Sequence, residues 1–122
     1  MQRFALLFTV RPGTEEKVAE IFRTYGRPSV QASTDTRLVS TSVFMKDNIV
    51  VRVFDIEGQL EDAMAFLPQQ EAIRKLEQEL NPLLEYPRDF ANSDDAKRFF
   101  QRALMTRVTH REAGRPLGEN NE

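Results

Sequence analysis

Strand-like and helix-like segments follow one another along this chain in an order that few folds share. Four segments have the apolar alternation or the β-branched and aromatic content of strands: 2–10, 37–45, 49–56 and 103–110. Segments with helical periodicity separate the first strand from the second and the third from the fourth. The sequence therefore predicts the order β-α-β-β-α-β, with the two central strands joined as a hairpin through the turn Lys46-Asp47-Asn48.

The helices of this pattern have recognisable start and stop signals. Thr14 caps a first helix that ends at Gly26, and its buried stripe consists of Val18, Ile21, Phe22 and Tyr25. A second helical region begins near Gly58, is interrupted by Pro68 and resumes as far as Leu80. The predicted fold class is therefore α+β: a ferredoxin-like βαββαβ domain with a split second helix.

One face of the predicted sheet lacks a cover. The helices, including a short one that begins at Ser93, cover one face of a four-stranded antiparallel sheet, and the chain supplies nothing for the other. A second copy of the same sheet is the economical cover, which predicts a homodimer with a barrel-like interface, a dimeric α+β barrel. Residues 1–110 form this single domain, and 111–122, which have no periodicity, are expected to be a disordered tail.

Charge and residue content argue against several classes of function. The net charge of −2 disfavours a nucleic-acid partner. The chain has no cysteine, a single histidine and no glycine-rich phosphate loop, so neither a metal nor another cofactor is expected. No apolar stretch approaches the roughly 20 residues of a membrane span or reads as a signal peptide, so a cytoplasmic protein without a membrane partner is predicted.

Arg52 and Tyr25 are the candidates for catalytic residues. Arg52 lies in the middle of the apolar strand VVRVF, where it would stabilise an enolate or ketone oxygen of a substrate. The alternatives are an ion pair with a nearby acid, such as Asp55 or Glu57, or a place in the dimer interface. Tyr25 ends the first helix, where its phenol would donate to a substrate carbonyl, or where it is a core tyrosine with its hydroxyl at the edge.

Two serines are candidates for binding a substrate. In the alternation of the second strand, Ser40 and Ser42 share one face with Leu38 and Phe44. Small hydroxyl side chains on a buried face leave space and offer hydrogen-bond donors, which suits the wall of a pocket. Ordinary hairpin positions explain the two serines equally well.

Three further candidates for substrate binding lie in the last third of the chain. Tyr86 and Arg88 stand between prolines, where they would close one end of a cavity or merely anchor a loop. His110 ends the predicted last strand and carries the only side chain that titrates near neutrality when unperturbed. A solvent-exposed role is the default for it.

Two stretches of this sequence resemble a known family. The stretch TDTRLVSTSVFMKDNIVVRVFDIEG and the later QQEAIRKLEQELNPLLEYPRDF resemble the SchA/CurD-like proteins of spore-pigment and aromatic polyketide biosynthesis. More distantly, roughly nine-tenths of the chain is similar to the tetracenomycin-type polyketide cyclases. Those are dimeric α+β barrels, as are the cofactor-free antibiotic-biosynthesis monooxygenases that share their fold.

The resemblance implies a function. Cyclases of this type hold a poly-β-ketone in a pocket between sheet and helices and guide aldol ring closure, which dehydration to an aromatic ring follows. The resemblance implies the same cyclase or aromatase activity for this chain. It also implies a small-molecule poly-β-ketone or aromatic polyketide as ligand and an acyl carrier protein as a further partner. The cyclases' two histidines correspond to Tyr25 and Arg52, so folding the substrate would count for more than abstracting a proton.

Two alternative functions stay open beside the cyclase. One is a cofactor-free monooxygenase that oxidises an aromatic polyketide to a quinone. The other is a non-catalytic dimeric chaperone of the synthase, which binds the growing chain or the synthase itself. Oxygen uptake would identify the first, and pathway flux that survives the loss of Arg52 would identify the second.

Overall fold

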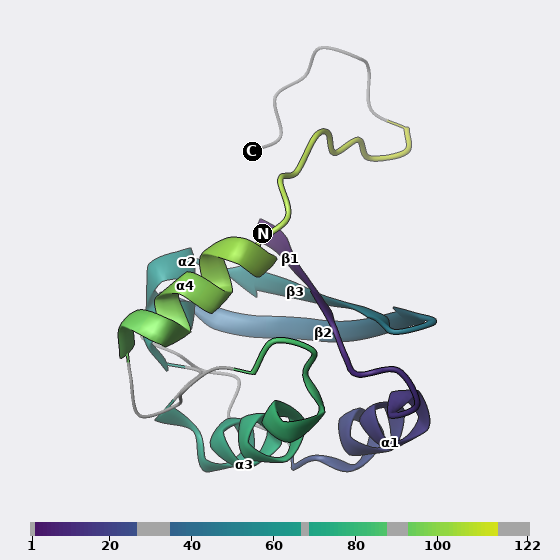
Figure 1. The fold of residues 1–122 in the computed structure, drawn as a ribbon. Coiled ribbons are helices and arrows are strands. Elements are labelled where there is room, and N and C mark those ends of the chain that lie inside the picture. The colour runs from purple at the N-terminus through teal and green to yellow at the C-terminus, as the bar shows by residue number, and fades with distance from the viewer. Residues whose placement is uncertain (1, 27–34, 67–68, 88–92, 115–122) are drawn as a thin grey trace.

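A computed structural model describes residues 2–26, 35–66, 69–87 and 93–114 of the chain. These residues form an α+β domain with a three-stranded antiparallel sheet (Figure 1). The strands are β1 (Gln2–Thr9), β2 (Arg37–Lys46) and β3 (Ile49–Glu57), in the spatial order β1-β3-β2. The predicted hairpin is confirmed, because β2 and β3 pair along their length and only Asp47 and Asn48 separate them.

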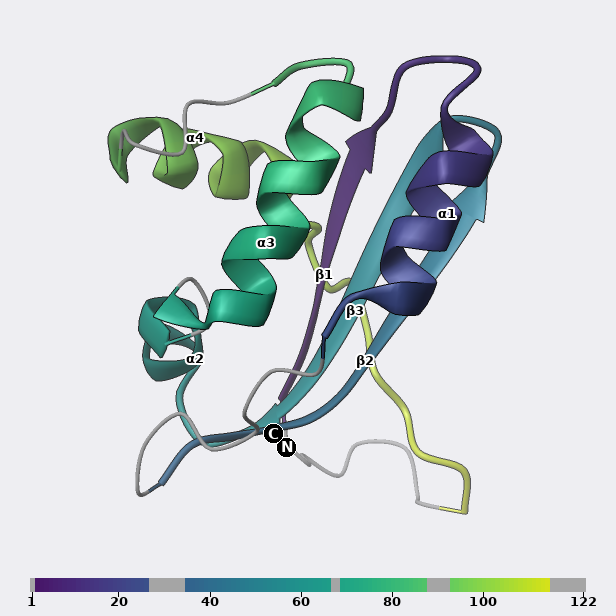
Figure 2. The same ribbon diagram turned by 90° about the horizontal axis from the view of Figure 1, so that it is seen from below.

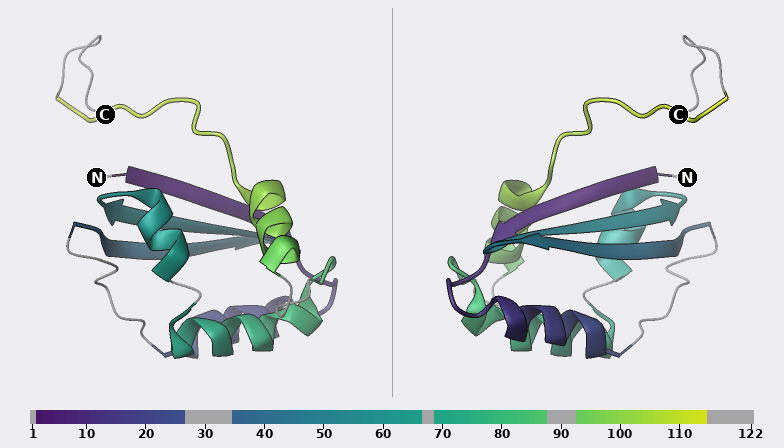
Figure 3. Two further views of the ribbon diagram at one scale, coloured as in Figure 1. Left: turned by 90° about the vertical axis from the view of Figure 1, so that its left-hand side faces the viewer. Right: turned by 90° about the vertical axis from the view of Figure 1, so that its right-hand side faces the viewer.

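The helices follow the predicted order, including the division of the second helical region. They are α1 (Glu15–Thr24), α2 (Leu60–Phe66), α3 (Glu71–Leu80), the 3-10 turn η2 (Asn81–Leu83) and α4 (Ser93–Ala103). Helices α1 and α3 lie side by side on one face of the sheet, and α2 and α4 stand toward its β1 edge (Figures 2 and 3). Among the described residues, no helix has both the length and the apolar character needed to cross a membrane.

The predicted fourth strand, 103–110, is the main difference from expectation. Ala103 is the last residue of α4, because the helix continues through Gln101 and Arg102, which favour helical conformation. Leu104 then forms an isolated antiparallel bridge with Leu6, and the Met105 N–H donates a 2.9 Å hydrogen bond to the carbonyl of Ala5. In the described chain beyond this point, no strand forms, so the sheet has three strands rather than four.

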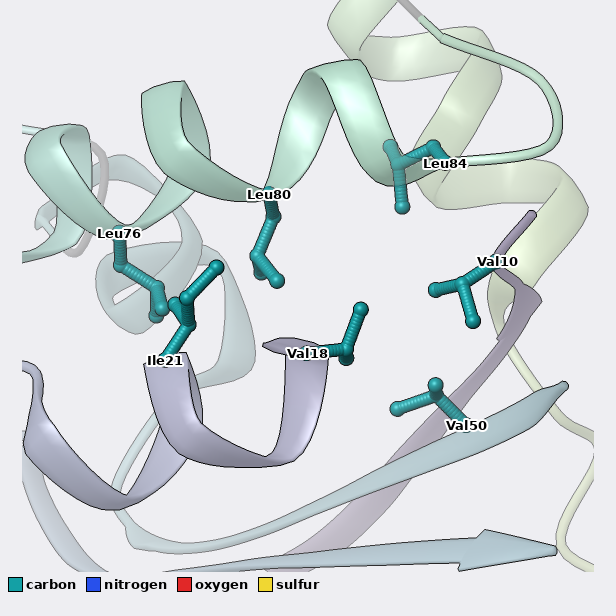
Figure 4. Close-up of a cluster of buried hydrophobic side chains, with 7 residues drawn as sticks. All are labelled: Val10, Val18, Ile21, Val50, Leu76, Leu80 and Leu84. Atoms are coloured by element: carbon teal, nitrogen blue, oxygen red, sulfur yellow. The ribbon is translucent and has the colours of Figure 1, made fainter. Parts of the chain in front are cut away.

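Two apolar clusters fill the space between the sheet and the helices. The first joins α1, α3 and the end of the sheet where β3 begins (Figure 4), and it consists of Val10, Val18, Ile21, Val50, Leu76, Leu80 and Leu84. The second lies toward α2 and α4 and consists of Leu6, Leu38, Phe54, Ile56, Ala63 and Ala103. Along β3, Val50 belongs to the first cluster and Phe54 to the second. The residue between them on the same face is Arg52.

Candidate functional site

Arg52 lies at the centre of the helix-covered face of the sheet. Its neighbours across the two strand pairs are Leu6 on β1 and Val43 on β2. Every second residue of β3 from Val50 onward is buried, and Arg52 follows this alternation. The central strand therefore directs a guanidinium into the layer between sheet and helices, where only 9% of the side chain is exposed.

The partner of Arg52 is an acid on helix α3. Its Nη1 donates a 3.1 Å hydrogen bond to Oε1 of Glu77, whose side chain is only 16% exposed. Neither acid suggested by the sequence is the partner: Asp55 pairs with Arg3, and Glu57 pairs with Arg37. Both acids occupy odd positions of β3, which alternation directs away from the face that carries Arg52.

Two aromatic rings also contact the guanidinium. The Cζ atom of Arg52 lies 5.3 Å from the ring centroid of Phe22 on α1 and 5.0 Å from that of Phe54 on β3. Such distances fall within the range of cation–π attraction, which is strongest where water is excluded. The site thus draws one residue from α1, two from β3 and one from α3.

The hydrogen-bonding capacity of Arg52 is only partly used. Within the described part of the chain, its guanidinium makes one hydrogen bond, to Glu77, although it has several N–H donors in a planar fork. A buried donor without an acceptor is costly, so such donors are normally met by water or by a ligand. The remaining N–H groups are suited to an oxygen atom that the described residues do not supply.

Tyr25 lies near this site without a hydrogen bond to it. Its main-chain N–H donates a 3.0 Å hydrogen bond to the carbonyl of Ile21 at the end of α1, and its half-buried side chain packs against the first apolar cluster. Phe22, almost one turn earlier on α1, is the residue that reaches Arg52. Tyr25 therefore belongs to the same helix layer as the site.

The two serines lie on the opposite face of the sheet. A β-bulge between Leu38 and Ser40 turns Leu38 toward the helices, where it is buried. It leaves Ser40 opposite Asp55 on the face that no described helix covers, called here the uncovered face. The expectation that the serines share a face with Leu38 was wrong, because the extra residue at Val39 breaks the alternation. Neither Ser40 nor Ser42, which pairs with Val53, is on the side of Arg52.

A polar cluster surrounds Ser40 on that uncovered face. The Arg3 guanidinium lies 2.6 Å from the Asp55 carboxylate, and the Ser40 hydroxyl donates a 2.8 Å hydrogen bond to the same carboxylate. The hydrogen bond from Arg3 is the main reason why the pKa of Asp55 is lowered, and the bond from Ser40 adds to it, while partial burial opposes both. Ser40 thus donates a hydrogen bond to the acidic member of an ion pair in this structure.

The other candidates are not brought to Arg52. Tyr86 is exposed, and Arg88 lies outside the described residues. His110 is in the exposed segment after α4, where its Nε2 lies 3.6 Å from a carboxylate oxygen of Glu112. Of the residues selected from the sequence, Arg52 alone is at the centre of the site, with Tyr25 nearby.

Glu77 is the functional candidate that the sequence interpretation missed. The buried stripe of α3 consists of Ile73, Leu76 and Leu80, and Glu77 falls on the same face at the i+4 position from Ile73. A charged residue within the apolar stripe of a helix is an available signal, since it requires a partner when it is buried. That partner is Arg52.

The fold and the site together define an α+β domain with a buried Arg–Glu pair between its sheet and its helices. The model of the SchA/CurD like domain matches residues 1–113, which is nearly the whole chain. The chain therefore belongs to the SchA/CurD-like family.

Three proteins of Streptomyces species are similar to this chain. It is 43% identical over 108 residues to the 42.8 kDa protein in whiE locus of Streptomyces coelicolor. The matched region is 88% of this chain and 27% of that protein. It is 42% identical over 114 residues to Polyketide synthase CurD of Streptomyces cyaneus, covering 93% of this chain and 31% of CurD. Protein SchA of Streptomyces halstedii is 35% identical over 120 residues, 98% of this chain and 32% of SchA. The chain spans about a third or less of the length of these relatives.

Proposed function

We propose that this protein acts in aromatic polyketide biosynthesis as a cyclase or aromatase that guides aldol ring closure of a poly-β-ketone between its sheet and its helices. Membership of the SchA/CurD-like family and similarity to a protein named Polyketide synthase CurD support the pathway. The observation that carries the chemistry is the buried guanidinium of Arg52, whose N–H donors exceed the acceptors that the described protein offers it.

The proposed chemistry needs a group that stabilises negative charge on oxygen. Carbon atoms between two ketones lose a proton to form an enolate, and the enolate carbon attacks a distant carbonyl of the same chain. Charge passes from the enolate oxygen to the new alkoxide. Arg52 would donate hydrogen bonds to these oxygens in a site that excludes water, where such fixed donors contribute most.

Glu77 supplies a proton acceptor beside Arg52. Its carboxylate would take the proton from the substrate carbon and return it to the alkoxide, so that the aldol step balances without an external reagent. The two groups are 3.1 Å apart, which supports a base and an oxyanion donor that act on neighbouring atoms of one substrate. Loss of water from the aldol product then gives the aromatic ring.

The aromatic side chains around the pair suit the same substrate. Phe22 and Phe54 each present a ring face to the Arg52 guanidinium, in the layer in which the substrate would bind. Flat ketone and phenol groups pack well against such faces. Holding two distant carbons of one chain at bonding distance removes a large entropic part of the barrier, so confinement and Arg52 would act together.

The test is a minimal polyketide synthase reconstituted with and without this protein. Ring closure that the protein directs would change the distribution of cyclised products seen by chromatography and mass spectrometry. Arg52→Lys keeps the charge but loses the planar fork of donors, and we expect it to lower the yield of directed product at least about tenfold. Arg37→Lys, at an exposed ion pair, is the matched control and should act like the parent.

Three outcomes would count against the cyclase. An identical product distribution with and without the protein would remove it. Oxygen consumption with an anthrone-like substrate, in the absence of added flavin or metal, would favour a monooxygenase instead. Full activity of Arg52→Lys would leave a chaperone role as the better account.

A further inference from the structure

The helix-covered face of the sheet is not closed evenly. Every residue that β3 turns toward the helices, from Val50 to Ile56, is buried. Of the two residues that lie opposite Arg52, Leu6 on β1 is buried, whereas Val43 on β2 is only half-buried. In Figure 2, α3 lies toward β1 and α1 lies toward β2. The layer around Arg52 is therefore more open on the β2 side, which α1 borders.

Thr41 is the hydroxyl-bearing residue of β2 on this side. The β-bulge that sends Ser40 to the uncovered face places Thr41 on the face of Arg52, where it pairs with Phe54. The two Cβ atoms of such a pair lie about 5 Å apart. The ring centroid of Phe54 in turn lies 5.0 Å from Cζ of Arg52. Thr41 is exposed, whereas Phe54 is buried, so the Thr41 side chain lies where the Arg52 layer meets solvent.

The Thr41 hydroxyl makes no hydrogen bond within the described part of the chain. Two other hydroxyl groups of the same sheet do, because Thr9 and Ser40 each donate a 2.8 Å bond to a carboxylate. An exposed hydroxyl without a protein partner is hydrated, and a ligand oxygen can replace a weakly held water. Thr41 thus offers a donor to a ligand on the same face as the unused donors of Arg52.

The end of α1 contributes aromatic side chains to the same side of the layer. Phe22 and Tyr25 are both half-buried, and Tyr25 and Val43 pack against the same apolar cluster. Apolar and aromatic side chains with a few well-placed donors are the usual lining of a site for a small organic ligand. A linear chain of alternating ketones fits such a lining, since each ketone adds an oxygen acceptor to an otherwise apolar chain.

We propose that Thr41 binds the substrate: its hydroxyl donates a hydrogen bond to one ketone oxygen of a linear poly-β-ketone while Arg52 binds another, and the ligand reaches Arg52 between α1 and β2. The inference rests on the proposed function and deepens it, because it names a second contact of the same ligand. Two oxygens held at fixed positions set the register of the chain against Arg52. The register decides which carbonyl meets the enolate, so Thr41 selects the ring that closes.

An NMR titration of the full chain with diacetylacetone, a short linear triketone, tests this contact. Saturable changes in amide chemical shift give the dissociation constant without any catalytic turnover. Thr41→Val replaces the hydroxyl with a methyl group and keeps a β-branched side chain, so the strand is preserved. We expect it to weaken binding about fivefold, the usual effect of one lost hydrogen bond, and we expect Thr41→Ser to bind like the parent.

Ser42→Ala is the matched control, because Ser42 is the next residue of β2, is equally exposed and lies on the uncovered face. It should bind the triketone like the parent. Equal affinity of Thr41→Val and the parent would overturn the role of Thr41 and leave the proposed function standing. A parent without saturable shift changes, or equal affinity of Arg52→Lys and the parent, would instead overturn the site at Arg52 and this inference with it.

Discussion

Arg52 and Glu77 place two opposite charges in a layer that is otherwise apolar. Removing two charges from water costs several kcal/mol, and the attraction and hydrogen bond between them offset this cost only in part. A buried ion pair is therefore weak evidence that the pair stabilises the fold. A pair of apolar side chains would fill the same space without that cost. The N–H groups of Arg52 that find no acceptor in the described part of the chain agree instead with the role in substrate binding proposed for this guanidinium.

Removal of Glu77 should destabilise the fold more than removal of a comparable surface acid. Glu77→Ala leaves the buried Arg52 guanidinium without its acceptor, so we expect the free energy of unfolding to fall by about 2 kcal/mol. Glu57→Ala breaks an exposed pair with Arg37 and should cost at most about 0.5 kcal/mol. Urea denaturation at one protein concentration measures both, and equal losses would show that Arg52 does not depend on Glu77.

The ion pair on the uncovered face predicts a dependence of stability on pH. The Arg3 hydrogen bond lowers the pKa of Asp55 in the folded protein. Such a group stabilises the fold above its unfolded pKa of about 3.9, and the contribution is lost as pH falls through the lower, folded value.

Asp55→Asn is the variant that reveals this dependence. The difference in unfolding free energy between parent and Asp55→Asn should stay constant from neutral pH to about 5 and shrink below about pH 4, because only the parent has a carboxyl group at this position that takes up a proton when the protein unfolds. Urea denaturation at equal protein concentration across this range measures it. A difference that grows as pH falls would contradict a lowered pKa.

At the scale of elements, the junction between β3 and α2 is held by a buried threonine. The Thr36 hydroxyl accepts a 2.9 Å hydrogen bond from the N–H of Gln59 and donates a 3.0 Å bond to the carboxylate of Asp62 in the first turn of α2. Gly58 makes the turn possible: its φ is +108°, and a Cβ there would collide with the Asp35 carbonyl oxygen and with Thr36. This turn therefore needs a residue without a side chain.

Gly58→Ala should be markedly more destabilising than Gly13→Ala. Both glycines have a positive φ, but a Cβ at Gly13 would meet nothing within 4 Å. Gly13→Ala thus reports backbone strain, about 1 kcal/mol, and Gly58→Ala adds a steric cost of about 1–3 kcal/mol. Thermal or urea unfolding gives the two values, and equal effects would mean that the turn relaxes around the added methyl group.

Strands and helices differed in how far they could be predicted. The β2–β3 hairpin, α1 and the divided second helical region agree with the predicted order because each has a local pattern and local stop signals. The strand expected at 103–110 does not form: α4 continues to Ala103, and beyond it only Leu104 and Met105 of this segment contact β1. Whether such a segment becomes a strand depends on whether the edge of another strand is available to pair with it. The local sequence carries no information about that distant edge.

At the scale of the whole molecule, the sheet has two different faces. Arg52 lies on the face that α1 and α3 cover, whereas Ser40 and Asp55 lie on the face that no described helix covers. The chain spans about a third or less of the length of its relatives, so it corresponds to one part of those proteins.

The amino-acid sequence by itself determined the order of elements as far as the divided second helical region, the hairpin and the position of Arg52 in an apolar strand, because periodicity and turn residues act over a few neighbouring positions. Tertiary structure alone decided that Glu77 meets Arg52, since 25 residues separate them and only the packing of α3 on β3 brings them within 3.1 Å. It also decided that Ser40 lies across the sheet from Arg52, because one extra residue at Val39 reverses the faces of the strand. Contacts between distant segments depend on packing, and packing is a property of the folded chain.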